Sequence, residues 1–276
     1  MSISDSAVSM RGVTKTFPGV IANEDVNIDF KKGEIHALLG ENGAGKSTLM
    51  NVLTGIYRQD GGEIFVNDEK VAFNKAADAI VAGIGMVHQH FKLVKAFTVA
   101  QNLHLGWDKT TKWLSHRQLT ENAVKLSQEF GLGIQPDAYV DELSAGAQQR
   151  VEIVKVLSRG TQVLIVDEPT AVLTPPEVES LFKVLRALKA SGRTIIFISH
   201  KLDEVLDISD RVTILRRGKV VATHDSKDMT TRSLANLMVG RDVIFKRMDR
   251  YEPAENERHD ILHLNKVCAE HENGAR

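Results

Sequence analysis

Apolar residues along this chain gather in short runs that glycine, proline and charged residues separate. The runs EIHALL, VLIVD and TIIFIS are almost wholly apolar, which is typical of strands buried on both faces of a parallel sheet. Stretches with apolar residues at three- and four-residue spacing follow them, which favours helices packed on that sheet. This alternation predicts an α/β fold.

Two regions depart from the alternation. AVSMRGVTKTF and VNIDF, near the start, have loosely alternating apolar positions and predict short strands, as does GGEIFVND. From about Thr98 to Leu157 the pattern is mainly helical, interrupted by GLGIQPDAYVDELSAG. A helical insertion between strands of one α/β unit is the simplest account of that region.

A glycine-rich segment follows the first buried run. GENGAGKS, Gly40–Ser47, matches G-x-x-x-x-G-K-[S/T]. The following residues predict an amphipathic helix that closes near Gly55, with an apolar face formed by Leu49, Val52, Leu53 and Ile56. A strand, a glycine loop and a helix are the context that a phosphate-binding loop requires.

The residue types in this loop suit a nucleoside triphosphate. The glycines let backbone N–H groups close around a β-phosphate at the positive end of the helix. Lys46 is a cation for the β- and γ-phosphates, and the Ser47 hydroxyl is a ligand for Mg²⁺. A chance glycine loop at a strand–helix turn is the alternative interpretation.

A second segment, VLIVDEPT, ends a buried run in two carboxylates. Asp167 would hold the hydration shell of Mg²⁺, and Glu168 could polarise an attacking water as a general base. Without the phosphate loop, such a pair would indicate only solvated charge at a strand end. Thr174 and Glu177 predict a capping box for the next helix, which has prolines at its first positions.

Composition narrows the class of protein. The 276 residues carry 35 Lys+Arg against 36 Asp+Glu, a formal charge of -1, so any anion site must be local. The single cysteine, Cys268, excludes a disulfide framework and fits a reducing compartment. The chain shows no secretory h-region and no apolar run near the ~20 residues that span a bilayer.

LSAGAQQR, Leu143 to Arg150, completes a set of four motifs. GENGAGKS, LSAGAQQR, VLIVDEPT and FISH, in this order, resemble an ATP-binding cassette (ABC) ATPase over roughly residues 7 to 240. The resemblance implies a P-loop NTPase core with an N-terminal antiparallel β-subdomain and an inserted α-helical subdomain. It implies ATP and Mg²⁺ as cofactors and ATP hydrolysis driven by head-to-tail dimerisation of cassettes.

The resemblance also assigns residues to roles. Ser144 and Gly146 would contact the γ-phosphate of ATP held by the opposite cassette, although an ordinary N-cap also explains Ser144. Phe17 would stack on adenine, with an edge-strand or core phenylalanine as the alternative. The catalytic set would be Glu168, His200 and Gln89. The magnesium ligands would be Ser47, Gln89 and Asp167. The nucleotide-binding set would be Phe17, Gly40, Glu41, Asn42, Gly43, Ala44, Gly45, Lys46, Ser47, Thr48 and Asp167, with Ser144 and Gly146 in trans.

Three positions depart from the family pattern. The family's LSGGQ reads LSAGA here, with Ala145 and Ala147 in place of glycine and glutamine. Alanine at the first position requires a negative φ or a small strain cost. Thr174 stands where the loop after the second motif usually ends in aspartate, so a helix cap is kept and a charge is lost. The two composite ATP sites are therefore expected to be unequal.

Finer similarities point to one group within the family. DEPTAVLTPPE, FISHKLDEV and GMVHQHFKLV resemble the first cassette of importers that fuse two ATPase domains and take up simple sugars or nucleosides, and HQHF resembles the nucleoside type. This predicts a cassette at 7–240, a charged linker at 241–259, and at 260–276 the first strand region of a truncated second cassette.

The importer interpretation brings its own partners. These would be integral-membrane permease subunits, the second cassette and, through the complex, a solute-binding protein, with no nucleic acid. The location would be peripheral, at the cytoplasmic face of a bacterial membrane. His90 to Leu105 would receive the permease's coupling helix, with Phe91, Leu93 and Phe97 as anchors unless they pack in the core.

Two other classes compete with this interpretation. A soluble tandem ABC ATPase acting on ribosomes or nucleic acid would carry a long basic linker, whereas this chain has a short one and no basic excess. A non-catalytic regulatory cassette conflicts with the intact Lys46, Asp167, Glu168 and His200.

Overall fold

A computed structural model describes residues 5–106, 114–240 and 265 of the chain. Its strands are β1 (Ser6–Phe17), β2 (Val20–Lys31), β3 (Ile35–Leu39), β4 (Gly61–Val66), β5 (Glu69–Val71), β6 (Ile84–Val87), β7 (Val163–Asp167), β8 (Thr194–Ser199), β9 (Arg211–Arg216) and β10 (Lys219–Asp225). Its α-helices are α1 (Lys46–Leu53), α2 (Ala76–Val81), α3 (Val99–His104), α4 (His116–Phe130), α5 (Ala145–Leu157), α6 (Pro175–Ala190), α7 (Leu202–Ile208) and α8 (Thr231–Val239). Two short 3₁₀ helices are η2 (Val140–Glu142) and η3 (Ser226–Asp228).

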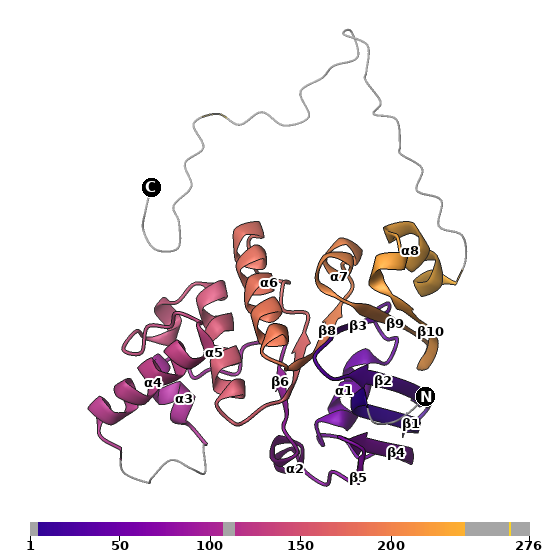
Figure 1. Ribbon diagram of the computed structural model, residues 1–276, viewed down its shortest axis with the longest axis horizontal. Coiled ribbons are helices and arrows are strands. Elements are labelled where there is room, and N and C mark those ends of the chain that lie inside the picture. Colours follow the sequence, from indigo (N-terminus) through magenta and orange to yellow (C-terminus); the bar gives the residue numbers. More distant parts are fainter. Residues whose placement is uncertain (1–4, 107–113, 241–264, 266–276) are drawn as a thin grey trace. The chain divides into compact units, whose positions relative to one another are not determined.

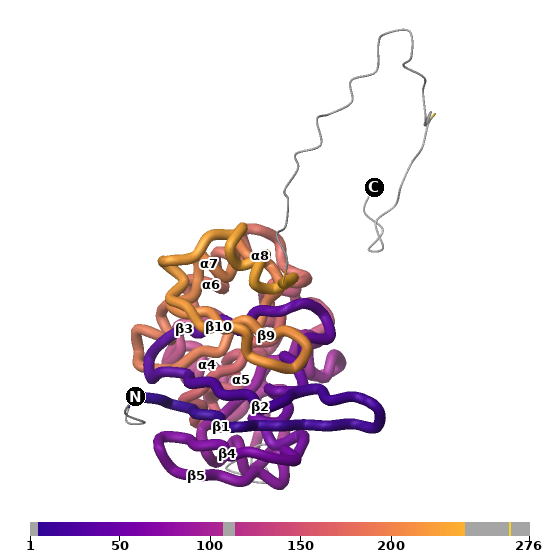
Figure 2. Tube along the Cα trace, turned by 90° about the vertical axis from the view of Figure 1, so that its right-hand side faces the viewer, coloured from indigo at the N-terminus to yellow at the C-terminus, as the bar shows by residue number. Residues whose placement is uncertain are grey.

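The strands form two sheets. One has the order β2-β1-β4-β5 and is antiparallel throughout. The other has the order β10-β9-β3-β8-β7-β6, in which β9, β3, β8, β7 and β6 are parallel neighbours and only β10 is antiparallel. Figure 2 shows β1, β2, β4 and β5 lying together on one side of the β9–β10 hairpin. The predicted antiparallel subdomain and α/β core are confirmed.

The mainly parallel sheet is buried on both faces, which explains its uninterrupted apolar runs. Successive residues of β8 enter different clusters: Ile195 and Phe197 pack with α5 and α6, whereas Ile196 and Ile198 pack with α1 and the antiparallel sheet. This division follows from the two-residue period of a strand. The core thus lies in two layers, one on each side of the sheet.

The helical insertion is also confirmed. α3, α4 and α5 gather at one end of the cassette, away from the antiparallel sheet (Figure 1). Ser115 caps α4 through the backbone N–H of Gln118, and Gly131 ends that helix in a left-handed conformation. Ala123 is the fully buried residue of α4, and Leu119, Leu126 and Phe130 of the same helix pack against the core around it.

Three details differ from the sequence prediction. Ile56 does not belong to the apolar face of the first helix, because α1 ends at Leu53, and Ile56 is 48% exposed. β5 and α2 were not anticipated, since each is too short to show a period: three residues and six residues. None of these differences touches the strand ends that carry the motifs.

The chain divides into two units, Met1–Val243 and Ile244–Arg276. The predicted linker at 241–259 and second strand region at 260–276 lie outside the described residues, apart from the exposed Asn265, and Cys268 lies outside them too. Among the described residues, none of the helices combines the length and apolarity that crossing a bilayer requires.

Candidate functional site

Three of the four motif segments, GENGAGKS, VLIVDEPT and FISH, meet at one edge of the parallel sheet. β3 runs into the glycine loop, β7 ends at Asp167, and His200 directly follows β8. These strands are neighbours in register, with Leu39 opposite Ser199 and Asp167 opposite Ile198. Because the carboxyl ends of parallel strands share one edge, segments far apart in sequence converge there, as is usual for ligand sites in open α/β sheets.

The glycine loop is held against two neighbouring segments. Gly45 has a φ of 98°, and a Cβ at this position would lie 2.4 Å from the carbonyl oxygen of Ala22. Gly218, in the β9–β10 turn, donates its N–H to the carbonyl of Ala44 at 3.0 Å. No side chain caps the start of α1, so its first N–H groups are free to face an anion.

Lys46 extends back over its own loop. Its Nζ donates to the carbonyl oxygens of Gly40 at 2.8 Å and Glu41 at 3.0 Å. Burial lowers the pKa of Lys46, while the charges of Glu168 and Asp167 oppose that shift. The ammonium group is therefore positioned between backbone carbonyls and two carboxylates, where a phosphate could replace the carbonyls.

Glu168 is the centre of a hydrogen-bonded group. Its Oε2 accepts from Gln89 Nε2 at 3.1 Å, and its Oε1 lies 3.0 Å from His200 Nδ1. Glu168 has a φ of 46°, in the left-handed region that non-glycine residues rarely adopt. Its N–H still donates to the carbonyl oxygen of Ile198 at 2.9 Å, so the backbone turns away only after the pairing of β7 with β8 is complete.

Asp167 has a different environment from its neighbour. Burial, and then the adjacent Glu168 carboxylate, raise the pKa of Asp167 to about 6, against the opposing charge of Lys46. A carboxylate whose charge is so poorly compensated is a good ligand for a divalent cation. Ser47 and Gln89 line the same cleft, and their hydroxyl and amide oxygens, with the Asp167 carboxylate, are a donor set that fits Mg²⁺.

These side chains line a cleft of ≈ 740 Å³. Phe17, at the end of β1, forms one wall; it is 39% exposed and meets the ring of Tyr57 edge-on at 5.3 Å. Lys15 Nζ lies 5.3 Å from the Phe17 centroid. Phe17 is therefore not a core residue, and its edge-to-face contact with Tyr57 fixes the orientation of its ring in the wall of the cleft.

Most of the predicted residues are brought together here. The cleft is lined by Phe17, Asn42, Gly43, Ala44, Gly45, Lys46, Ser47, Thr48, Gln89, Asp167 and Glu168, with Val20, Ile21, Ala22, Arg217 and Gly218 in addition. Sequence reasoning missed the last five. The segment RRGK, Arg216–Lys219, is typical of a turn between two strands. Its position beside the glycine loop depends on tertiary contacts that no local pattern encodes.

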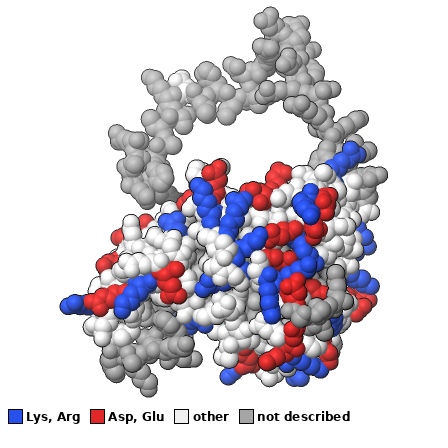
Figure 3. All heavy atoms as spheres, viewed as in Figure 1, with Lys and Arg blue, Asp and Glu red and all other residues white. Residues whose placement is uncertain are grey.

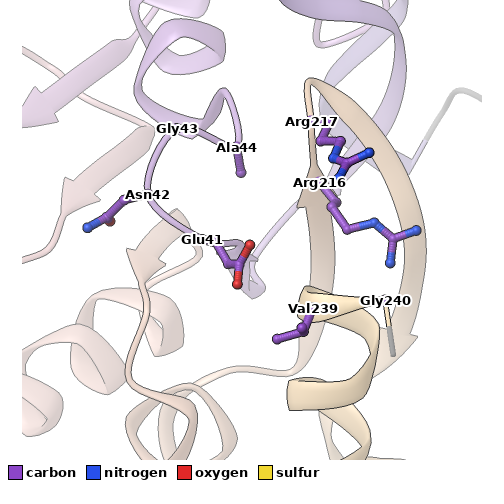
Figure 4. Close-up of a pocket in the computed structure, with 8 residues that line it drawn as sticks. All are labelled: Glu41, Asn42, Gly43, Ala44, Arg216, Arg217, Val239 and Gly240. Carbon is purple, nitrogen blue, oxygen red and sulfur yellow. The ribbon is translucent and has the colours of Figure 1, made fainter. Parts of the chain in front are cut away.

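Glu41 lines instead a smaller hollow of ≈ 260 Å³, which shares Asn42, Gly43, Ala44 and Arg217 with the cleft. Figure 4 shows Arg216 and Arg217 next to each other at the end of β9, with Val239 below them and Asn42 pointing away. Arg216 donates to the carbonyl of Leu237 at 3.2 Å, which ties α8 to the hairpin. The hollow therefore lies between the end of α8 and the glycine loop.

Ser144 and Gly146 lie outside the cleft, at the start of α5. Ser144 is the N-cap and accepts from the N–H of Ala147, and Ala145 begins the helix without a positive φ. Both the Ser144 hydroxyl and the Gly146 N–H donate to Glu177 Oε1, each at 3.1 Å. The predicted capping box of Thr174 and Glu177 is confirmed, but the contact of Glu177 with this loop was not foreseen.

The sequence pattern of the ABC transporter family matches residues 23–171. The chain is 48% identical over 244 residues to the nucleoside import ATP-binding protein of Lactococcus lactis subsp. cremoris, covering 88% of this chain and 48% of the relative. It is 50% identical over 240 residues to the guanosine import ATP-binding protein of Bacillus subtilis, covering 87% and 47%. The chain spans about half the length of these relatives.

Solved structures agree with the fold. A nucleotide-free ATP-binding cassette from an ABC transporter superposes with a TM-score of 0.73 at 26% identity, covering 85% of this chain and 95% of that one. An ATP-binding cassette in its ADP conformation gives 0.72 at 27% identity, with coverages of 85% and 95%. With the sheet topology, the convergent motifs and the matched sequence pattern in agreement, the chain belongs to the ABC transporter family.

Proposed function

We propose that this chain binds ATP with Mg²⁺ and hydrolyses it as the first cassette of an importer for nucleosides or simple sugars. The observation that carries the proposal is the convergence of Lys46, Asp167, Glu168 and Gln89 on one cleft. His200 joins this group through its contact with Glu168. Each is a residue type that phosphoryl transfer to water uses: a phosphate cation, a metal carboxylate, a base and its partners.

In this proposal the cleft holds the nucleotide from Phe17 to Gln89. The adenine stacks on Phe17, and the phosphates lie against the N–H groups of Gly43 to Thr48 with Lys46 beside them. Gly40 closes the end of β3 and Glu41 and Asn42 shape the loop. Ser47, Asp167 and Gln89 would hold Mg²⁺, whose chemistry is to neutralise charge that develops on the phosphate oxygens.

The residues around Glu168 would prepare water for attack. Glu168 accepts the water proton, and Gln89 fixes one carboxylate oxygen through its 3.1 Å bond. His200, 3.0 Å from the other oxygen, orients the carboxylate and adds a polar group towards the γ-phosphate. These two contacts hold the base on two sides, which reduces the reorganisation needed for reaction.

The site is proposed to be complete only with a second cassette. Ser144 and Gly146 are at the start of α5, away from the cleft of their own chain, where a hydroxyl and a helix N-terminus suit an anion. A head-to-tail arrangement would place them on the γ-phosphate of the opposite cassette. The relatives are about twice the length of this chain, which supports a second cassette in the same polypeptide.

A groove beside Gln89 supports a permease partner. It has a volume of ≈ 260 Å³, and its lining includes Met86, His88 and Lys92. Buried Glu152 lies in its wall and accepts from the backbone N–H of Lys92 at 2.6 Å, and burial raises the pKa of Glu152. Of the predicted anchors beyond it, Leu93 packs against the core, whereas Phe97 is 37% exposed and free to contact a coupling helix.

Nucleosides are the solute class that the relatives support best. The two import proteins with nucleoside or guanosine in their names are 48% and 50% identical to this chain, and a ribose import protein of Rubrobacter xylanophilus is 44% identical. We also propose a peripheral position at the cytoplasmic face of a bacterial membrane, and a solute-binding protein as part of the complex. On the face that Figure 3 shows, basic and acidic side chains are interspersed, a distribution unlike a basic nucleic-acid-binding patch.

Replacing Phe17 with alanine should weaken ATP binding by about 5- to 30-fold, because a stacked base loses about 1–2 kcal/mol. Titration calorimetry with ATP and with inorganic tripolyphosphate separates stacking from phosphate binding. Tripolyphosphate affinity should stay constant, and Phe17→Trp should restore ATP affinity. Equal ATP affinity in the alanine variant would assign Phe17 a packing role with Tyr57 only.

Uptake in the host tests the importer assignment. Cells that lack the gene should lose uptake of labelled nucleosides and recover it when the intact gene is supplied, while ribose and galactose uptake persists. Loss of sugar uptake alone would replace the nucleoside class by sugars and keep the importer. Unchanged uptake together with a translation defect would overturn the proposal in favour of a ribosome-associated ATPase.

A further inference from the structure

The carboxylate of Glu177 joins the starts of two helices, α5 and α6. Its Oε1 accepts from the Ser144 hydroxyl and the Gly146 N–H, each at 3.1 Å. Its Oε2 accepts from the N–H of Thr174 at 3.0 Å and from the Thr174 hydroxyl at 2.9 Å. One side chain thereby bonds the start of α5 with one oxygen and the start of α6 with the other.

The contact with α5 depends on the glycine at position 146. A Cβ there would lie 2.6 Å from Glu177 Oε1, a separation that atoms do not tolerate. The hydrogen bonds from Thr174, with smaller contributions from Gly146 and Ser144, lower the pKa of Glu177. The carboxylate is thus ionised at neutral pH and seated at a helix N-terminus, which favours an anion.

The same two donors cannot serve a second anion at the same time. A serine hydroxyl has one proton and a backbone amide has one, and both protons point at Glu177 Oε1. A phosphate oxygen that approached Ser144 and Gly146 would have to replace this carboxylate oxygen. It would also meet the repulsion of a like charge at short range.

We infer that Glu177 is an internal competitor for the γ-phosphate: in the separated cassette it occupies the Ser144 and Gly146 donors, and it leaves them when an ATP-loaded cassette closes on this face. The inference rests on the proposed head-to-tail pairing. The bonds from Oε2 to Thr174 do not involve α5, so the cap of α6 persists while Oε1 is displaced. Glu177 therefore sets how much ATP is needed to close the pair.

The test compares Glu177→Gln with Glu179→Gln, a change of the same kind at an exposed position of the same helix. Both are introduced into the 276-residue chain that carries Glu168→Gln, so that ATP is not consumed. Sedimentation equilibrium with saturating ATP measures the self-association constant. Glu177→Gln should tighten ATP-dependent self-association about two- to tenfold, because the charge is removed while size and capping are kept, and Glu179→Gln should not change it.

A second measurement, made without ATP, tests the contact between Glu177 and Ser144. The carboxyl carbon of Glu177, followed by NMR over pH, should titrate below an ordinary glutamate, and Ser144→Ala should raise that pKa. An ordinary pKa that Ser144→Ala leaves unchanged would overturn the inference, as would equal self-association of the Glu177→Gln and Glu179→Gln chains. Absence of any ATP-dependent self-association in the Glu168→Gln chain would overturn head-to-tail pairing between two copies of this chain, and the inference with it.

Discussion

Lys46→Ala is expected to weaken ATP binding by about 10²–10³-fold, which corresponds to about 3–4 kcal/mol. Lys46 Nζ now bonds the carbonyls of Gly40 and Glu41, at 2.8 Å and 3.0 Å, and a triphosphate would exchange these for charge-assisted bonds. Two such bonds at about 1.5–3 kcal/mol each account for the expected loss. The alanine chain also leaves the phosphates facing Asp167 and Glu168 without their cation, which adds repulsion.

Titration calorimetry with ATP measures this effect, and Lys183→Ala is the matched control. Lys183 lies on the exposed side of α6, so its loss removes one positive charge from the same domain without touching the cleft. Thermal unfolding followed by circular dichroism checks that both variants fold. ATP affinity in Lys46→Ala within threefold of the control would show that the glycine loop does not bind the triphosphate.

The parallel half of the site could be predicted from the sequence because its determinants are local. Three apolar runs predict buried strands: EIHALL, VLIVD and TIIFIS. The motif that accompanies each run lies at the carboxyl end of that strand. Once such strands are parallel neighbours, their carboxyl ends lie at the same edge of the sheet. The observed register of β3, β8 and β7 places them there. The cleft with Lys46, Asp167 and Glu168 follows from pattern and topology together.

The contacts that could not be predicted are those between segments without a shared period. Arg217 and Gly218 reach the cleft because the N–H of Gly218 bonds Ala44, a tertiary contact of the β9–β10 turn. Glu177 was predicted as a capping residue, which is a local role, but its bonds to Ser144 and Gly146 cross 33 and 31 positions of sequence. Ile56 has the sequence spacing of the apolar face of α1 but does not belong to it, because the helix ends at Leu53.

Asp167 and Glu168 are adjacent in sequence, yet the backbone conformation places their two carboxylates in different environments. Asp167 is the last residue of β7, and its pKa is raised to about 6, mainly by burial. Glu168, at a φ of 46°, turns out of the strand towards Gln89 and His200. The two carboxylates therefore meet different partners, and only Glu168 bonds both a glutamine and a histidine in the described part of the chain.

Glu168→Gln is expected to leave ATP binding intact and to slow hydrolysis by about 10²–10⁴-fold, the usual contribution of a general base. Glutamine has the same size, and its amide can still accept from Gln89 with one atom and face His200 Nδ1 with the other. What it loses is the basic oxygen that takes the proton of water. ATP affinity should therefore stay within about threefold while the chemical step slows, which separates a base from a binding residue.

The measurement is single-turnover hydrolysis of radiolabelled ATP by the full-length protein together with the permease subunits proposed above, alongside calorimetric binding of ATP. Glu179→Gln, which removes one carboxylate from the exposed surface of α6, is the matched control and should hydrolyse at the unaltered rate. Single turnovers are followed because two unequal sites would otherwise be averaged. A first-turnover rate within twofold of the Glu179→Gln protein would mean that Glu168 is not the base, and would leave its bonds to Gln89 and His200 a positioning role only.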